Sequence, residues 1–120
     1  MKKTILVAAL CVASSASWAV ALCTATGVGV PWTVANPPAG FTKAGFSPKC
    51  SANTYVTYLE GANTAAVGAT SKKGNQIFAG HTNGGAVGLA SGTSTCASAA
   101  ACTDTEATTA ATTALANSSS

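Results

Sequence analysis

Hydrophobic and polar residues alternate in short runs along most of this chain, a pattern typical of β-strands. Residues 54–59 give the strongest strand signal, because all six are β-branched, aromatic or leucine. Both faces of this segment carry apolar side chains, which indicates a central strand. The pattern predicts three further strands at residues 65–70, 76–81 and 86–90, so we expect an antiparallel meander.

Turn signals separate these segments. Residues 60–63 and 71–74 are expected to turn the chain, and Asn-Gly-Gly at residues 83–85 is a strong hairpin signal. Two prolines and a glycine predict a further turn at residues 36–40. Residues 22–34 alternate only imperfectly, because glycines interrupt them, and we expect an irregular edge strand there.

The C-terminal residues change to a helical pattern. Thr103 and Glu106 match a capping box, in which the threonine hydroxyl and the glutamate carboxylate each accept a backbone amide. Alanines favour a helix over residues 104–116, whereas the threonines among them weaken it, so the expected helix is short and marginal. Residues 117–120 are expected to fray. A wholly disordered tail over residues 103–120 is the alternative.

The first 21 residues have the pattern of an export signal. Lys2 and Lys3 precede a short apolar run at residues 5–13, which is too short to span a bilayer. Small residues then permit cleavage before Leu22, which we prefer, or before Val20. A lipid anchor on Cys23 is disfavoured, because lipid-attaching peptidases require a small residue before the cysteine and Leu22 is large.

Cleavage after Ala21 divides the chain into three parts. These are a signal peptide at residues 1–21, a β domain at residues 22–102, and a short helix with its tail at residues 103–120. The signal looks bacterial. We expect an exported protein at the cell surface or outside the cell, and a periplasmic location stays open.

The composition of the mature part excludes one class of function. The mature part contains four lysines and three carboxylates, and the chain contains no arginine. Nucleic acids and acidic lipids are bound through clustered cations, which this chain lacks. Ala, Gly, Thr and Ser make up 59 of the 99 residues after Ala21, and Leu, Ile, Val and Phe only 14. Small side chains with a few large anchors suit tightly packed strands.

Four cysteines follow the signal: Cys23, Cys50, Cys96 and Cys102. An even number in a small exported chain predicts two disulfides, with three pairings open. We expect the sequential pairing, because each pair then brackets a local unit. Such loops contribute about 3.6 and about 2.4 kcal/mol in the chain-entropy model. A metal site is the alternative, but the chain has no Cys-x-x-Cys pair and its only histidine, His81, is far from every cysteine.

No catalytic motif is evident. His81 is the only side chain that ordinarily titrates near neutral pH, and we expect it to be an exposed residue at a strand end. Only Glu60, Asp104 and Glu106 could orient it or serve as paired carboxylates, and the last two are explained by a helix start. We therefore predict that the protein is not an enzyme and has no catalytic, cofactor-binding or metal-binding residue, and no cofactor.

The large aromatic residues allow a second interpretation of the function. They could stack on a sugar, as in a carbohydrate-binding module, although most of them are needed for the core. The residues concerned are Trp32, Phe41, Phe46, Tyr55, Tyr58 and Phe78. A secreted or periplasmic module that binds a glycan or small ligand is thus the alternative function.

Two segments carry a resemblance to a known family. The run Phe-Ser-Pro-Lys-Cys-Ser-Ala-Asn-Thr-Tyr-Val begins at Phe46, and Lys-Gly-Asn-Gln-Ile-Phe-Ala-Gly begins at Lys73. Over residues 46–90 the chain resembles small exported proteins related to the separately encoded globular pilin domain, also called the second geopilin domain. The resemblance implies a β-rich extracellular domain on a surface filament, with no catalytic residues.

These observations lead to one functional hypothesis. We expect a mainly β fold, a small antiparallel meander or sandwich stapled by two disulfides, with a short C-terminal helix. We expect a non-catalytic extracellular structural protein that associates with itself or with a filament or pilin partner, through a sheet edge or through residues 104–116. No membrane span is expected in the mature protein.

Overall fold

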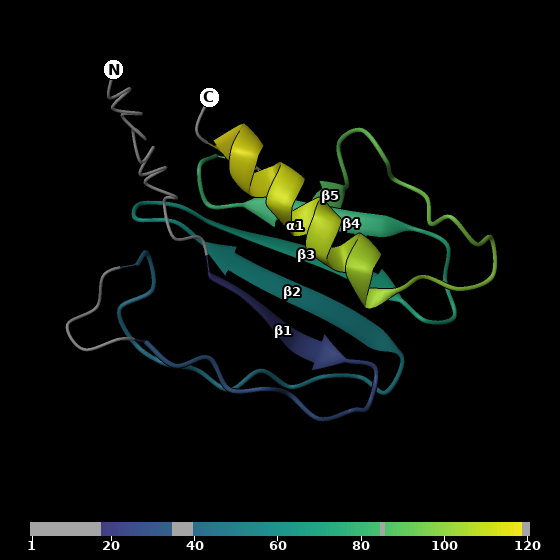
Figure 1. Cartoon of the computed structure of the whole chain (residues 1–120), viewed down its shortest axis with the longest axis horizontal. Coiled ribbons are helices and arrows are strands. Elements are labelled where there is room, and N and C mark those ends of the chain that lie inside the picture. The colour runs from purple at the N-terminus through teal and green to yellow at the C-terminus, as the bar shows by residue number, and fades with distance from the viewer. Residues whose placement is uncertain (1–17, 35–39, 85, 119–120) are drawn as a thin grey trace, which may run out of the picture.

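The computed structural model describes residues 18–34, 40–84 and 86–118. Five antiparallel strands form one sheet in the order of the sequence, and one helix follows them (Figure 1). The strands and the helix are β1 (Trp18–Thr24), β2 (Thr54–Glu60), β3 (Ala65–Ser71), β4 (Ile77–His81), β5 (Gly88–Leu89) and α1 (Asp104–Ser118). The expected mainly β meander with a C-terminal helix is confirmed.

The predicted strands agree with the observed ones to within a few residues. The main difference lies at the edge, where β1 begins at Trp18, inside the segment that the sequence assigns to the signal peptide. Only the last part of β1 overlaps the edge strand expected at residues 22–34, and the chain beyond Thr24 is irregular. The β4–β5 connection spans residues 82–87 and is longer than the two-residue loop that an Asn-Gly signal favours. Residues 36–39 of the turn predicted at residues 36–40, and the glycine at 85, lie outside the described residues.

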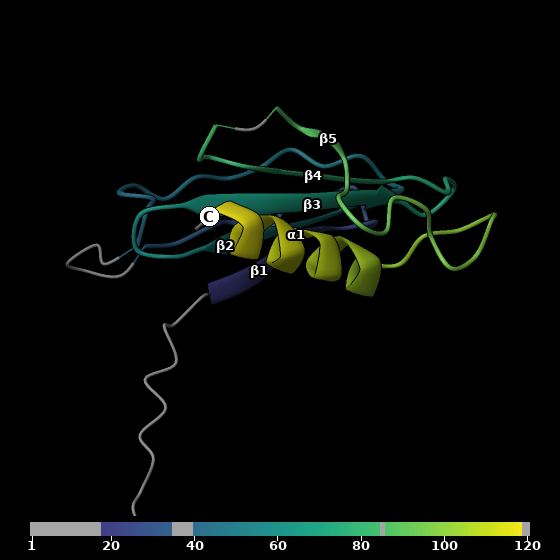
Figure 2. The ribbon, with the colours of Figure 1, turned by 90° about the horizontal axis from the view of Figure 1, so that it is seen from above.

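The helix covers only one side of the sheet (Figure 2). Its buried residues recur at helical spacing and are small: Ala107, Ala110, Ala111, Ala114 and Ser118. Because these side chains are short, the helix backbone approaches the strands closely. A Cβ atom on Gly68 of β3 would lie 2.0 Å from the Ala107 carbonyl oxygen and 2.7 Å from the Ala111 nitrogen. Gly68 is therefore required for the contact between α1 and β3.

The helix also starts as predicted and ends later than predicted. The Thr103 amide donates to the Glu106 carboxylate at 2.7 Å, and the Glu106 amide donates to the Thr103 hydroxyl at 3.4 Å, which is the expected capping box. The helix continues through Asn117 and Ser118 instead of fraying there, because Ser118 is buried and Asn83 donates a hydrogen bond to its carbonyl group. Packing thus stabilises a segment whose intrinsic helix propensity is weak.

Two disulfides join the irregular segments to this frame. Cys23 of β1 is bonded to Cys50, and Cys96 is bonded to Cys102 just before α1, with Cα–Cα distances of 5.6 and 5.3 Å. The sequential pairing predicted from the sequence is confirmed. Each disulfide lies in one of two buried clusters, one around Trp32 and Leu22 and the other around Ile77.

The contact at Gly68 generates a test of the fold. Gly68→Ala places a methyl group where the α1 backbone already lies, so we expect the free energy of unfolding to fall by at least about 2 kcal/mol, as overpacking in a rigid core does. Gly88→Ala is the matched control, because a Cβ there meets no atom within 4 Å. We expect this control to change stability by less than about 0.5 kcal/mol. Equal effects of the two substitutions in denaturant unfolding would contradict the close helix–sheet contact.

Candidate functional site

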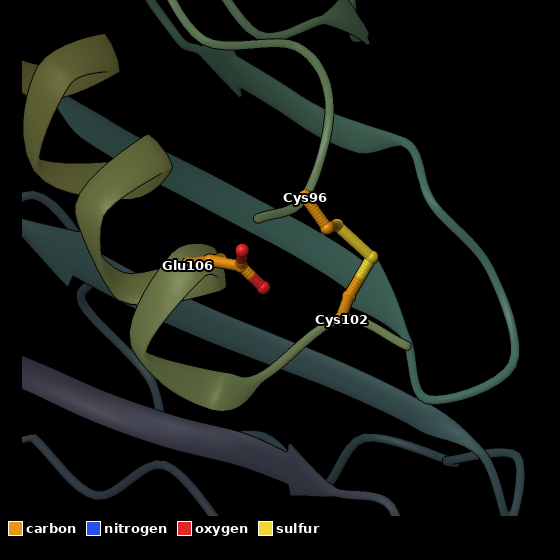
Figure 3. A group of neighbouring side chains, drawn as sticks. All are labelled: Cys96, Cys102 and Glu106. Carbon is orange, nitrogen blue, oxygen red and sulfur yellow. A yellow bond between two sulfur atoms is a disulfide. The ribbon is translucent and has the colours of Figure 1, made fainter. Parts of the chain in front are cut away.

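The group Cys96, Cys102 and Glu106 has the composition of a metal site, and its possible ligand atoms lie within 4.8 Å of one another (Figure 3). However, both sulfur atoms are bonded to each other. The Glu106 carboxylate accepts the Ala97 amide at 2.6 Å as well as the Thr103 amide. A metal of this ligand type requires thiolates, which the disulfide removes. In the oxidised protein this group therefore fastens residues 96–102 to the start of α1.

His81 lies at the end of β4, as the sequence predicts, but it is half-buried. Its Nδ1 atom is buried and has no hydrogen-bond partner among the described residues. Alternation along β4 places His81 with Ile77 and Ala79 on the helix side of the sheet, whereas Glu60 lies on the opposite side. Glu60 therefore lies on the wrong side of the sheet to orient the His81 imidazole. Among the described residues, no serine or cysteine is paired with His81 and a carboxylate.

Glu60 is the most buried ionisable side chain described, with an exposed fraction of 2%. Its Oε2 atom accepts the Thr42 amide at 2.9 Å and the Tyr58 hydroxyl at 3.2 Å, and Tyr58 also bonds to the Thr42 hydroxyl. Burial and the neighbouring Glu60 charge raise the pKa of Tyr58 above its ordinary value. Tyr58 is thus a neutral hydrogen-bond donor, and the group holds the loop that contains Thr42 against β2. The sequence indicated Glu60 as a turn residue and as one of three carboxylates that could orient His81, but not its burial.

Three of the six aromatic residues singled out in the sequence form a cluster, whereas Phe41 and Phe78 are exposed outside it. Trp32 is buried, with an exposed fraction of 4%, and its ring meets Tyr58 edge to face with 4.9 Å between centroids. Phe46 also meets Tyr58 edge to face, with 5.8 Å between centroids. This cluster covers the second side of the sheet over β1 and β2. Trp32 has no free ring face on which a sugar could stack.

On the side of the sheet opposite α1, no helix or aromatic cluster among the described residues covers β3, β4 and β5. Phe78 alternates with Ile77 and Ala79, which face the helix, so it lies on the opposite side, and Leu89 is its direct partner on β5. Val87 lies over Gly80 on the same side, where a Cβ on the glycine would be 2.8 Å from a Val87 methyl group. The exposed fractions of Phe78, Leu89 and Val87 are 42%, 57% and 68%. We call these three residues, with Val67, the open face.

A shallow hollow of about 190 Å³ lies beside the open face. Tyr58, Ala65 and Val67 line it from the sheet, and Val87 lines it from the connection before β5. The sequence singled out Tyr58 and Phe78 as possible sugar-stacking residues, but not the surface on which they lie. The signal that was available is the isolated phenylalanine at position 78, which alternation places opposite Ile77 on β4.

Comparison of the chain with protein-family models gives no match, and comparisons with curated proteins and with solved structures likewise give none. Among the described residues, no helix is long and apolar enough to cross a membrane. The disulfide-bonded domain is compatible with an oxidising, exported environment.

The Glu106 contacts predict a dependence of stability on pH. The Ala97 amide above all, with Thr103, lowers the pKa of Glu106, so the folded state favours the ionised carboxylate. This contribution is complete above the ordinary glutamate pKa and is lost as the pH falls through the lowered value. We expect Glu106→Gln to be less stable than the wild type at pH 7, and the difference to disappear in acid.

Asp104→Asn is the control for this experiment. It removes a charge from the same helix turn, but no described hydrogen bond depends on the Asp104 side chain, so we expect a smaller loss at pH 7. Thermal unfolding of the three proteins from pH 7 to acid measures both effects. A wild-type advantage over Glu106→Gln that persists unchanged in acid would show that ionisation of Glu106 does not stabilise the fold.

Proposed function

We propose that this protein is a non-catalytic extracellular structural protein, a subunit associated with the bacterial cell surface or with a pilus or other filament. The signal-like first 21 residues support export, and the two disulfides suit an oxidising compartment. The proposed location is the cell surface or the extracellular space, with the periplasm as the alternative. The weak positive charge supports partners other than nucleic acid.

The open face is the observation that carries this proposal. Large apolar side chains that share one side of a sheet are a feature of surfaces that bind other proteins. β3, β4 and β5 contain no lysine, arginine, aspartate or glutamate, so the face meets no charge repulsion when a similar surface approaches. The alanine face of α1 already packs on the sheet, so only the outer, threonine-rich face of the helix is left for association. We therefore favour association through the sheet over association through residues 104–116.

A module that binds a glycan or small ligand is the second candidate. The hollow lined by Tyr58 and Val67 favours it, since ligand sites are concave and mostly apolar. Its volume of about 190 Å³ is, however, below the roughly 300–1,000 Å³ usual for small-molecule sites. The burial of Trp32 also removes the best stacking residue. For these reasons we place the binding module second.

The open face can be tested by charge substitution. We expect the purified exported protein to self-associate at high concentration, and Phe78→Asp or Leu89→Asp to prevent this by placing a carboxylate on the contact surface. Val28→Asp is the matched control, because Val28 is 68% exposed but does not belong to the open face. Light scattering measures association, and electron microscopy of producing cells shows whether the protein lies on a surface structure. A strictly monomeric wild type that is absent from every surface assembly would favour the binding module.

A further inference from the structure

The predicted signal cleavage site lies inside a strand of the sheet. The sequence favours cleavage after Ala21, whereas β1 runs from Trp18 to Thr24. In register, Trp18 to Ala21 pair with Glu60 to Thr57 of β2, and the ladder is irregular between Ala21 and Cys23. Cleavage therefore removes the part of β1 before the irregularity and leaves the part that contains Cys23.

The remaining part of β1 is held in place. Cys23 is bonded to Cys50, and Leu22 accepts a hydrogen bond from the Val30 amide at 2.8 Å. Gly29 forms a bridge with Cys23 on the outer side of the strand. The edge of the sheet is thus protected at residues 22–23, whereas residues 57–60 of β2 lose their neighbour when the leader is removed. Unpaired amide and carbonyl groups at a sheet edge form a template for another strand.

Cleavage also empties the position that the Val20 side chain occupies beside the buried cluster. Val20 packs against the buried cluster of Leu22, Cys23 and Trp32, and Tyr58 packs against the same cluster. Ala19, by contrast, is exposed. Removal of the leader therefore uncovers a backbone edge together with one apolar position beside the cluster. In strand addition, the main chain supplies affinity and the side-chain position supplies specificity.

The surroundings define the chemistry of the segment that would fit. Glu60 is buried at one end of this edge, and it pairs with no cation among the described residues, so a carboxylate next to it would be repelled. The segment that occupies the edge in the uncleaved chain is uncharged and alternates small residues with Val20.

We propose that residues 57–60 of β2, uncovered when the leader is removed, form an acceptor site for an extended, uncharged segment of a partner protein. This segment places an aliphatic side chain where Val20 lies in the uncleaved chain. The inference rests on the proposed function as a subunit of an assembly and names the edge through which a partner is joined. It is independent of the open face, which lies over β3 to β5 and not at the β2 edge.

A capped peptide of residues 18–21 is the probe for this site. We expect it to bind the natural exported protein, whose intact mass should place its first residue at Leu22. We expect no binding to a form that begins at Trp18, because its own strand occupies the edge. If the exported form is partly unfolded, the peptide should restore its circular dichroism and its cooperative unfolding.

Two peptide variants test the assigned positions. Val20→Asn should weaken binding by about tenfold, since an amide then replaces the aliphatic contacts of Val20 with the buried cluster. Ala19→Asn is the matched control and should bind nearly as well as the natural peptide, because Ala19 is exposed. Equal binding of the two variants would overturn the assignment of the Val20 position.

Two outcomes would overturn the acceptor site itself. One is a natural first residue at Val20, which would keep that position filled. The other is an exported form that begins at Leu22 and neither binds the peptide nor refolds with it. If such a protein still associates through Phe78 and Leu89, the acceptor site is wrong and the structural function stands. If it associates with nothing, both proposals fail.

Discussion

The close contact between the α1 backbone and Gly68 is the constraint on which the rest of this structure depends. The chain has few large apolar residues, so it cannot fill a wide space between a helix and a sheet. Ala107 and Ala111 are fully buried, and opposite them Gly68 has no side chain at all. The layers therefore meet at short range, and many weak dispersion contacts between small groups replace the few large contacts of an ordinary core.

Three large aromatic residues lie on the other side of the sheet. Trp32, Tyr58 and Phe46 pack together over β1 and β2, where the Cys23–Cys50 bond and the Glu60 hydrogen bonds hold the irregular segments. Nothing comparable covers β3 to β5 among the described residues. The two sides of the sheet thus differ in chemistry, with one closed by a helix of small residues and the other divided between an aromatic cluster and the open face.

Much of this fold follows from local sequence, and what does not follow depends on tertiary contacts. The strand at residues 54–59 and the cap formed by Thr103 and Glu106 are predictable because propensity and spacing act within a few residues. The start of β1 is not, since small residues near Ala21 satisfy a signal peptidase as readily as they satisfy a strand. Gly68 has the appearance of a strand breaker, and its role becomes visible only when the helix lies on it. The burial of Glu60 depends on a loop that is distant in sequence.

The position of α1 in the chain has a consequence for the order of folding. The helix follows every strand in sequence and packs on the central ones, so contacts of high sequence separation complete the domain. A chain that crosses a membrane with its amino end first would present β2, β3 and β4 before α1 arrives. During that interval Ile77 and the small residues around Gly68 are in water, and cooperative stability is gained only with the last helical turns. If the protein is exported as proposed, export is therefore a period of exposure that ends when the helix docks.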